Sequence, residues 1–264
     1  MHQRIQFYQG TISKWIPDRS ASILVVAGGR TDSDVFRELG FTNVLLSNVD
    51  QAPSEDAFAP YTWSRQDLEA LAYTEDTFDY VVVHAGLHHC RSPHRGLLEM
   101  FRVAKKAVIA IEPPDNLLVR IMQAIGLAQI YEYTAVCCHN GQCGGVNNTD
   151  IPNYIYRWTE REIEKTINSY APIARHRFHY NYGSGEPTRE FIGSNPIKRA
   201  VIALAKPAYW LFGLCLPKQQ NLFAFMIEKP VLSRDSHPWL SVEGSEVKFN
   251  PEWGKSKRGF SLCL

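Results

Sequence analysis

The stretch that decides the fold reads Ile-Leu-Val-Val-Ala-Gly-Gly-Arg-Thr-Asp at residues 23–32 and Asn-Val-Leu-Leu-Ser-Asn-Val-Asp at residues 43–50. Each part begins with an apolar run of buried-strand type; the first ends in small residues and the second in polar acceptors. Residues 32–39 carry apolar side chains at helical spacing, and Gly40 follows them as a C-terminal cap would. A strand, a helix and a second strand in this order build a nucleoside-binding crevice from backbone N–H groups and a polar strand end.

The same alternation continues along the chain. The run at residues 78–84 has strong β propensity, residues 93–104 predict a helix, and residues 107–111 predict another buried strand. Further strands are predicted at residues 174–182 and 222–228. Strands that alternate with helices at this pitch predict an α/β fold with a doubly wound parallel sheet.

Bulk composition limits the class of protein. The 264 residues carry a formal net charge of +1, so the charge balance does not imply a nucleic-acid partner. Hydrophobic residues at 45% and charged residues at 21% are ordinary for a soluble globular protein. No apolar h-region follows Met1, and six cysteines in a chain of this length do not form a small-scaffold disulfide pattern. We therefore expect a cytoplasmic protein with reduced thiols.

The second half of the chain is less regular. Residues 117–130 predict a helix, residues 133–153 predict a loop, and Thr159 with Glu162 three residues later forms a capping box for another helix. The apolar segment 196–217 contains lysine and proline and falls short of an uncharged membrane span. We expect no stable membrane insertion, and the segment is open to three interpretations: a lid, a homodimer surface or an interfacial helix.

Motifs at five places agree with one known family. They read Ala-Gly-Gly-Arg-Thr at 27–31, Asp-Leu-Glu-Ala-Leu-Ala-Tyr at 67–73, Phe-Asp-Tyr-Val-Val at 78–82, Ala-Gly-Leu-His-His at 85–89 and Arg-Val-Ala-Lys-Lys-Ala at 102–107. Together they resemble the class I S-adenosylmethionine-dependent methyltransferases, in particular the small-molecule and quinone-type branch, over about residues 23–113. The first motif departs from the family's Gly-x-Gly-x-Gly turn, because only Gly29 clearly fills a glycine slot. The last lacks the proline and both glycines of the family's Arg-Val-Leu-Lys-Pro-Gly-Gly turn.

The resemblance implies a Rossmann-like, mostly parallel seven-stranded sheet in which the strand near residues 222–228 is antiparallel. It also implies S-adenosylmethionine as the cofactor and methyl transfer to a small molecule as the activity. The ribose acceptor would be Asn48 or Asp50, and a carboxylate would hold the two hydroxyls more strongly than an amide. Asp67 and the backbone of Leu68 would contact the adenine. The full set of candidate cofactor-binding residues is Ala27, Gly28, Gly29, Thr31, Asn48, Asp50, Asp67, Leu68 and His84, although His84 lies inside a predicted strand, where a packing role suits it equally.

Methyl transfer needs mainly proximity and alignment, with a base if the acceptor is a hydroxyl or an amine. His88 and His89 follow the strand at residues 78–84, so either one is a candidate base or a pocket-shaping residue. Glu112, Tyr156 and Arg157 are candidate acceptor contacts. We expect an oxygen acceptor, and the aromatic and cationic residues favour a saccharide or glycosylated molecule, followed by a lipid-linked one.

The sequence leaves two other classes of protein open. A non-catalytic binding protein could retain this fold after losing the cofactor, given the altered glycine turns. A nicotinamide dehydrogenase would need glycines that Arg30 and Asp32 do not supply. We expect no metal site, because Cys137, Cys138 and Cys143 with His139 fit poorly to the separated ligand pairs of structural zinc.

The domain organisation follows from length and resemblance. At this length a single core with insertions is favoured over two equal halves. We expect one methyltransferase domain over residues 1–230. Insertions at about 114–160 and 183–217 would cover the acceptor site, and residues 231–264 would form a polar C-terminal extension.

Overall fold

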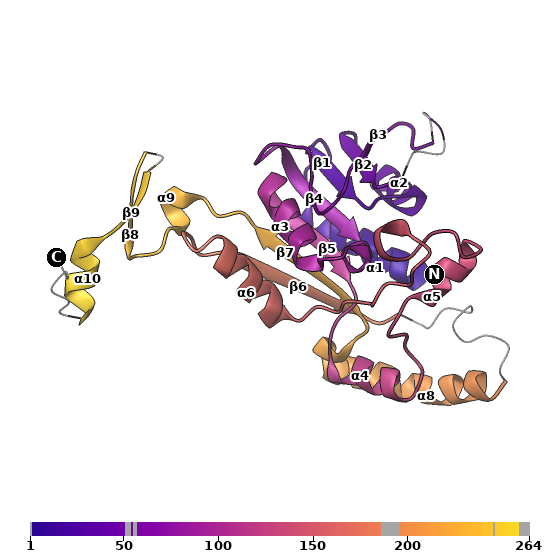
Figure 1. The fold of residues 1–264 in the computed structure, drawn as a ribbon. Coiled ribbons are helices and arrows are strands. Elements are labelled where there is room, and N and C mark those ends of the chain that lie inside the picture. The colour runs from indigo at the N-terminus through magenta and orange to yellow at the C-terminus, as the bar shows by residue number, and fades with distance from the viewer. Residues whose placement is uncertain (1, 51–53, 55–56, 186–195, 245, 259–264) are drawn as a thin grey trace.

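The computed structural model describes residues 2–50, 54, 57–185, 196–244 and 246–258. Within these residues the chain forms a seven-stranded sheet in the order β3-β2-β1-β4-β5-β7-β6 (Figure 1). The strands are β1 Ile23–Val26, β2 Val44–Asn48, β3 Thr62–Arg65, β4 Phe78–His84, β5 Ala104–Glu112, β6 Arg177–Gly183 and β7 Leu222–Glu228.

The strand directions confirm the predicted fold class. β1 is parallel to β2 and β4, β2 is parallel to β3, and β4 is parallel to β5. β7 is antiparallel to both of its neighbours, β5 and β6. This is the doubly wound, mostly parallel sheet with an antiparallel strand at residues 222–228 that the resemblance implied.

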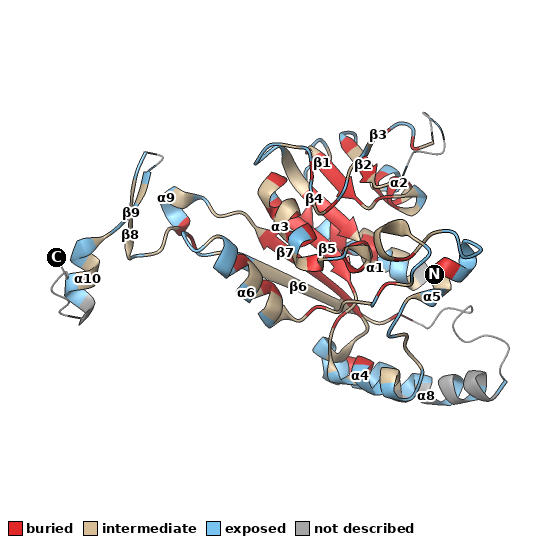
Figure 2. Cartoon of the chain, viewed as in Figure 1, coloured by how far each residue is buried: buried red, intermediate tan, exposed pale blue. Residues whose placement is uncertain are grey.

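Helices cover both faces of the sheet. The helices of the described residues are α1 His2–Trp15, α2 Arg30–Glu38, α3 Pro93–Val103, α4 Leu117–Ala124, α5 Tyr133–Cys138, α6 Glu160–Tyr170, α8 Pro196–Cys215, α9 Leu232–Asp235 and α10 Pro251–Arg258, with short 3-10 helices η1 Leu87–His89, η2 Val146–Asn148 and η3 Pro217–Gln219, and those that pack on the sheet include α1, α2, α3 and α6. Buried residues concentrate in the strands and on the helix faces against them (Figure 2).

The period-2 alternation of the central strands produces two apolar clusters. Val25 packs in one cluster with residues of α1 and α2, such as Ile12 and Phe36. Leu24 packs in the other, with residues of α3 and α6 such as Leu97 and Ile163. Because both faces of β1 are covered, its sequence is a continuous apolar run.

Three sequence-based expectations need correction. Strand β3 was not predicted, because Thr-Trp-Ser-Arg at the sheet edge has no apolar run. The helix expected over residues 117–130 ends at Ala124, since Gly126 adopts the left-handed conformation (φ +72°) that terminates helices. The loop expected over residues 133–153 contains α5 and η2.

The predicted capping box before α6 forms only in part. The Thr159 side chain accepts a hydrogen bond from the Glu162 backbone N–H at 3.2 Å, as predicted. The Glu162 carboxylate instead contacts the Tyr156 hydroxyl and, at 2.9 Å, the His94 imidazole.

The C-terminal region contains a small hairpin of β8 Leu240–Glu243 and β9 Glu246–Phe249, followed by α10. Figure 1 shows these elements lying apart from the seven-stranded sheet. Trp239 and Trp253 contact each other, with ring centroids 5.6 Å apart.

Helix α8 carries many exposed apolar side chains, among them Leu204, Leu211 and Leu214. Pro207 lies inside it. None of the helices in the described part of the chain is both long enough and apolar enough to cross a membrane.

Candidate functional site

A cavity of about 180 Å³ lies at the carboxyl ends of β1, β2 and β4. A second cavity of about 420 Å³ adjoins it, and Asn48 and Asp50 line both. Of the predicted cofactor residues, the first cavity is lined by Ala27, Asn48, Asp50, Asp67 and Leu68, and the second adds Gly28 and Gly29. The structure therefore brings together seven of the nine candidates. Thr31 and His84 line neither cavity.

The turn after β1 has the conformation that a glycine favours. Ala27 has φ +50° and Ala85, after β4, has φ +54°. The two turns touch at Gly86, where an added Cβ would lie 2.6 Å from the Ala27 Cβ and 2.8 Å from the Val83 side chain. The chain thus adopts this close turn with alanine in the family's first glycine slot, and Gly86 supplies the space.

The geometry distinguishes between the two predicted ribose acceptors. The Asn48 amide is engaged locally: its Nδ2 donates to Gly28 O at 3.3 Å and its Oδ1 accepts from Val49 N–H at 2.8 Å. Asp50 is exposed, and its carboxylate contacts the Asn148 side chain of η2. Asn48 therefore holds the turn, whereas Asp50 presents a carboxylate to both cavities.

His84 packs beneath α2. Its ring stacks on Tyr8 with centroids 4.4 Å apart, and its Nδ1 lies 3.7 Å from Asp32 Oδ1. Asp32 also accepts hydrogen bonds from the Tyr8 hydroxyl and the Gly29 N–H, both at 2.9 Å. His84 thus packs against the residues that hold the first turn of α2. This is the packing role that its position in the strand suggested.

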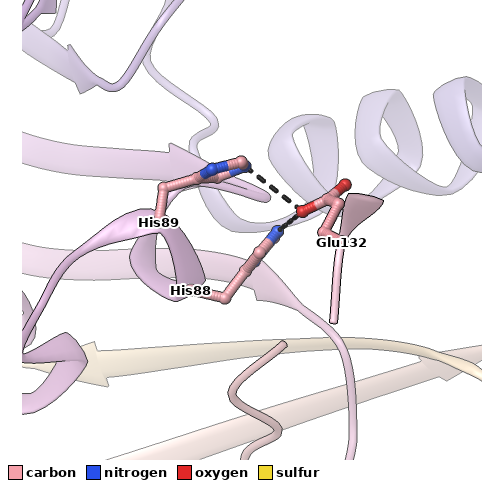
Figure 3. Close-up of side chains that lie close together, drawn as sticks. All are labelled: His88, His89 and Glu132. Carbon is pink, nitrogen blue, oxygen red and sulfur yellow. Dashed lines mark hydrogen bonds and ion pairs between the residues drawn. The ribbon is translucent and has the colours of Figure 1, made fainter. Parts of the chain in front are cut away.

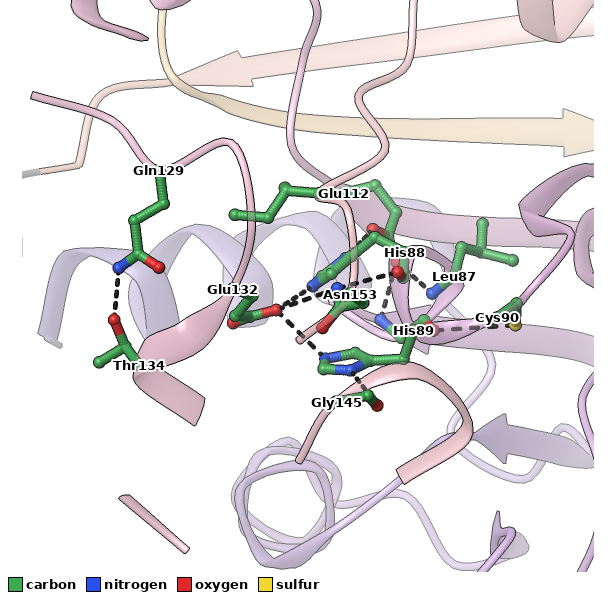
Figure 4. Close-up of polar contacts among 12 residues, drawn as sticks. Leu87, His88, His89, Cys90, Glu112, Gln129, Glu132, Thr134, Gly145 and Asn153 are labelled. Atoms are coloured by element: carbon green, nitrogen blue, oxygen red, sulfur yellow. Dashed lines mark hydrogen bonds and ion pairs between the residues drawn. The ribbon is translucent and has the colours of Figure 1, made fainter. Parts of the chain in front are cut away.

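His88 lies in the interior at η1, between two carboxylates (Figures 3 and 4). Its Nδ1 is 2.7 Å from Glu112 Oε2, and its Nε2 is 3.1 Å from Glu132 Oε2. Burial lowers the pKa of His88, but Glu112 and Glu132 outweigh burial and raise the pKa to about 9. An imidazolium at neutral pH has no lone pair with which to accept a proton, so in this state His88 cannot act as a base.

Glu112 organises the turn after β4. Its Oε1 accepts hydrogen bonds from the Gly86 and Leu87 N–H groups, both at 2.8 Å (Figure 4). Glu112 is only 3% exposed and lines neither cavity. We expected Glu112 to contact the acceptor, but the strand end that carries it is buried in the structure.

His89 is the histidine that lines the smaller cavity. Its Nδ1 lies 3.3 Å from Gly145 O, and its Nε2 lies 3.4 Å from Glu132 Oε2. Burial and the nearby charge of His88 lower the pKa of His89, so this imidazole is neutral at neutral pH.

Comparison with known protein families gives one match: residues 36–111 match the model described as a methyltransferase domain. This span runs from α2 to β5 and includes the turn after β4, whereas the turn after β1 lies before it. Within this chain, residues 36–111 therefore match a methyltransferase domain. Comparison with curated protein sequences gives no match.

Solved structures share the fold of this methyltransferase domain at low sequence identity. The [4+2]-cyclase SpnF is 15% identical with a TM-score of 0.53, covering 86% of this chain and 82% of that one. A putative methyltransferase in complex with the Trm112 activator, from Haloferax volcanii, is 11% identical with a TM-score of 0.51, at 86% and 90% coverage. The YcgJ protein of Bacillus subtilis is 12% identical with a TM-score of 0.50, at 88% and 100% coverage. These similarities show the fold alone, and one of the three proteins, SpnF, is named as a cyclase.

The methyltransferase domain has residues that fit the nucleoside part of its cofactor. An added Cβ at Gly29 would meet no atom within 4 Å, so the backbone there faces open space. Asp50 and Asp67 line the smaller cavity from the ends of β2 and β3, and both are exposed. Gly144, Asn147 and Asn148, at and next to η2, line the same cavity.

Two predicted acceptor residues of the methyltransferase lie elsewhere. Tyr156 and Arg157 line a cavity of about 610 Å³ with Tyr154, Arg161 and Lys165, and this cavity shares no lining residue with the other two. The Arg157 guanidinium donates to Gln129 O at 2.7 Å and to Ile155 O at 3.1 Å, so part of its role is to fasten the cover.

The cysteine-containing stretch does not gather into a ligand cluster. Cys137 and Cys138 are exposed at the end of α5, and the His139 Nδ1 lies 2.8 Å from Ala135 O. Among the described residues, a group of side chains with the spacing of metal ligands forms instead from His88, His89 and Glu132.

Glu132 and Asn153 belong to the site but were not predicted. The Asn153 Nδ2 donates to His88 O at 2.9 Å and to Glu132 Oε2 at 3.4 Å (Figure 4). Both residues come from stretches without a motif. The sequence feature that could have pointed to Glu132 is its position as an acid between two tyrosines, Tyr131 and Tyr133.

Proposed function

We propose that this protein transfers the methyl group of S-adenosylmethionine to a hydroxyl group of a small molecule held between the β4 turn and the cover segment. The observation that supports this most strongly is the continuity of the site: His89 borders the same cavity as Asp50 and Asp67. A cofactor held by those carboxylates would therefore lie next to the histidine cluster. When bound, the cofactor supplies a methyl group on a sulfonium that already carries a good leaving group.

The protein's own residues would bind and orient the two reactants. Asp50 would accept from the ribose hydroxyls, and Asp67 with the Leu68 backbone would contact the purine. The backbone of residues 27–29 would approach the cofactor closely, because the turn there has little side-chain bulk. Glu112 and the charged His88 would hold the β4 turn and His89 in place.

A hydroxyl acceptor is supported by the polar groups at and beside the smaller cavity. His89 lines that cavity, and Glu132 and Asn153 lie next to it, so nitrogen and oxygen atoms gather there that suit a hydroxyl better than an apolar carbon. A saccharide or glycosylated acceptor is supported by the 610 Å³ cavity, where Tyr154, Tyr156 and Arg161 offer aromatic faces and charge. A lipid-linked acceptor is supported by the exposed apolar side chains of α8.

The broader organisation is also part of the proposal. Residues 1–230 would act as one methyltransferase domain, with covers at 114–160 and 183–217 and an extension at 231–264. The contacts of Asn148 with Asp50 and of Glu132 with His88 support the cover role of the first insertion. Free thiols at the described cysteines support a cytoplasmic location, and the apolar face of α8 would serve a homodimer.

A second candidate is a non-catalytic binding protein with the same fold. It is favoured by one specific observation: the smaller cavity measures only about 180 Å³, and the cover contacts Asp50 directly. Ligand pockets commonly measure about 300–1,000 Å³, so the cover would have to shift or the adjoining cavity would have to take part.

Labelled methyl transfer separates these candidates. The full-length protein would be incubated with methyl-labelled S-adenosylmethionine and a panel of sugars, glycolipids and quinols. Gly29→Leu places a side chain in the open space of the larger cavity, so it should reduce transfer at least tenfold. Gly10→Leu, at an equally open position on the exposed face of α1, is the matched control and should retain transfer. Cofactor binding without transfer to any acceptor would favour the binding protein.

A further inference from the structure

The His88–His89–Glu132 cluster has the composition of a transition-metal site. Its three donor atoms, one per residue, all lie within 4.8 Å of one another (Figure 3). Two imidazoles and one carboxylate form the ligand set of several catalytic zinc centres, which hold the ion with three protein ligands and leave a position open. The same set also suits other divalent transition ions, whereas magnesium and calcium prefer oxygen ligands.

The distances between donor atoms match those across a bound ion. His88 Nε2 and His89 Nε2 lie 3.1 Å and 3.4 Å from Glu132 Oε2. Ligands about 2.0–2.2 Å from one ion lie roughly 3.0–3.5 Å apart in octahedral or tetrahedral geometry. Two of the three donor pairs therefore already have the separations that a single ion requires, and the third pair lies within 4.8 Å.

Both histidines are oriented by a second partner on the opposite ring nitrogen. His88 Nδ1 contacts the buried Glu112 carboxylate at 2.7 Å, and His89 Nδ1 contacts Gly145 O at 3.3 Å (Figure 4). Metal-binding histidines almost always donate this second N–H to a carboxylate or a backbone carbonyl, which fixes the tautomer and directs the other nitrogen toward the ion. Here that other nitrogen is Nε2 in both rings, and binding of the ion releases the proton that His88 Nε2 carries in the metal-free protein.

Asn153 adds an unsatisfied polar atom beside the cluster. The residue is 3% exposed, and its Oδ1 has no hydrogen-bond partner, while its Nδ2 contacts Glu132 Oε2 and His88 O. Buried polar atoms without partners are uncommon. A water molecule bound to the ion could donate to this oxygen.

From this geometry we propose that His88 Nε2, His89 Nε2 and Glu132 Oε2 bind one divalent transition-metal ion, of the zinc type, at the wall of the cofactor cavity. The ion joins η1 to the cover segment that carries Glu132. Three protein ligands leave at least one coordination position for water or an acceptor oxygen.

A role for the ion in catalysis rests on the proposed function, although its binding does not. A metal-bound hydroxyl has a lowered pKa and loses its proton to solvent. The resulting oxygen forms a bond to the methyl carbon as the carbon–sulfur bond breaks, and the sulfur keeps the electron pair. In that case no separate base is needed.

Metal binding can be measured on the full-length protein after treatment with a chelator. Titration calorimetry with Zn²⁺ and elemental analysis should give one ion per chain, and the ion should raise the unfolding temperature. Glu132→Ala and His89→Ala should each weaken binding at least tenfold. Glu228→Ala removes a carboxylate that contacts His179 at 2.7 Å at the sheet edge, so it is the matched control and should bind as the parent does.

The exposed cysteines need their own control. The double variant Cys137→Ser and Cys138→Ser should retain the ion, and the Co²⁺ form should lack thiolate charge-transfer bands. Absence of a stoichiometric ion, or unchanged binding in both Glu132→Ala and His89→Ala, would overturn the metal site. Binding of S-adenosylhomocysteine to the metal-free protein is measured separately, so a failed metal site and a failed cofactor site give different results.

Discussion

The carboxylate of Glu112 is bonded through both oxygens inside the protein. One oxygen accepts from two backbone N–H groups of the β4 turn and the other contacts His88, so the whole carboxylate is used inside the protein. A buried charge of this kind is stabilising only while its partners are in place, because removing one partner leaves the other unpaired.

Replacing the charge of Glu112 should therefore be costly. Glu112→Gln should lower the free energy of unfolding by about 2–4 kcal/mol, since the charged His88 then lacks its buried counter-ion. Glu228→Gln, which alters a partly exposed pair with His179, should cost less than about 1 kcal/mol. Urea denaturation of both variants tests this, and equal costs would contradict a supporting role for Glu112.

At the residue scale, most residues predicted for the cofactor line the two adjoining cavities, whereas Glu112, Tyr156 and Arg157, predicted for the acceptor, line neither. Gly29 and Asp50 could be placed at this rim because each follows a predicted strand, and parallel strands bring their ends to one rim. Asp67 was named from the resemblance alone, because the strand before it was not predicted. Glu112 also follows a strand, but the sequence does not reveal that the neighbouring turn covers it. Glu132 could not be predicted, because it lies in an irregular segment whose path through space the sequence does not reveal.

At the scale of elements, the segment after β3 is held by one ion pair of α3. The Glu99 carboxylate accepts from Leu71 N–H at 2.9 Å, and Arg102 donates to Leu71 O and Tyr73 O at 2.8 Å and 2.7 Å. The two side chains also contact each other at 2.7 Å. This clamp fixes the segment that carries Asp67 and Leu68.

The clamp should depend on pH. The hydrogen bond from Arg102 is the main cause that lowers the pKa of Glu99 below its ordinary value of 4.5. The stability it gives is therefore present above that value and is lost as pH falls through the lowered pKa. Glu99→Gln should cost about 1–2 kcal/mol at pH 7 and progressively less below about pH 4.5.

The matched control for this clamp is Glu252→Gln. Glu252 forms an exposed i,i+3 pair with Lys255 on α10, so its loss should change stability by less than about 0.5 kcal/mol. Chemical denaturation across the pH range gives both values. A cost of Glu99→Gln that stays constant down to pH 3 would contradict the electrostatic account.

The strands of the sheet were predicted where burial gives their sequences a clear apolar pattern. β1, β4, β5 and β7 are apolar over most of their length, and the structure confirms them. Strand β3 has intermediate or exposed residues throughout, so its sequence resembles a loop. Helix α5 is only six residues long, and a helix this short has little stability of its own. The polar sequence around it therefore predicted a loop.

At the scale of the whole molecule, the C-terminal region is built from its own contacts. His237 stacks on Trp239 with centroids 4.1 Å apart, Trp239 contacts Trp253, and Asn250 N–H donates to Trp239 O at 2.8 Å. Figure 1 shows this region apart from the sheet. The change in composition near residue 231 led us to expect a C-terminal extension, but it did not predict the hairpin.

Deletion of residues 237–264 should therefore leave the methyltransferase domain intact. The contacts of Asp235 with Arg177 remain in such a protein. Its free energy of unfolding should change by less than about 0.5 kcal/mol, as for surface changes away from the core. A large fall in the denaturation midpoint would show that the extension stabilises the domain.

The central claim is that the rim between β1, β2 and β4 binds the adenosyl cofactor through Asp50. Calorimetric titration of S-adenosylhomocysteine into the full-length protein tests it most directly, with Asp50→Ala and Asn148→Ala beside the parent. The account predicts one site in the parent, at least tenfold weaker binding in Asp50→Ala, and equal or tighter binding in Asn148→Ala, because that change releases Asp50 from the cover. No binding by the parent, or the same affinity in Asp50→Ala, would contradict it.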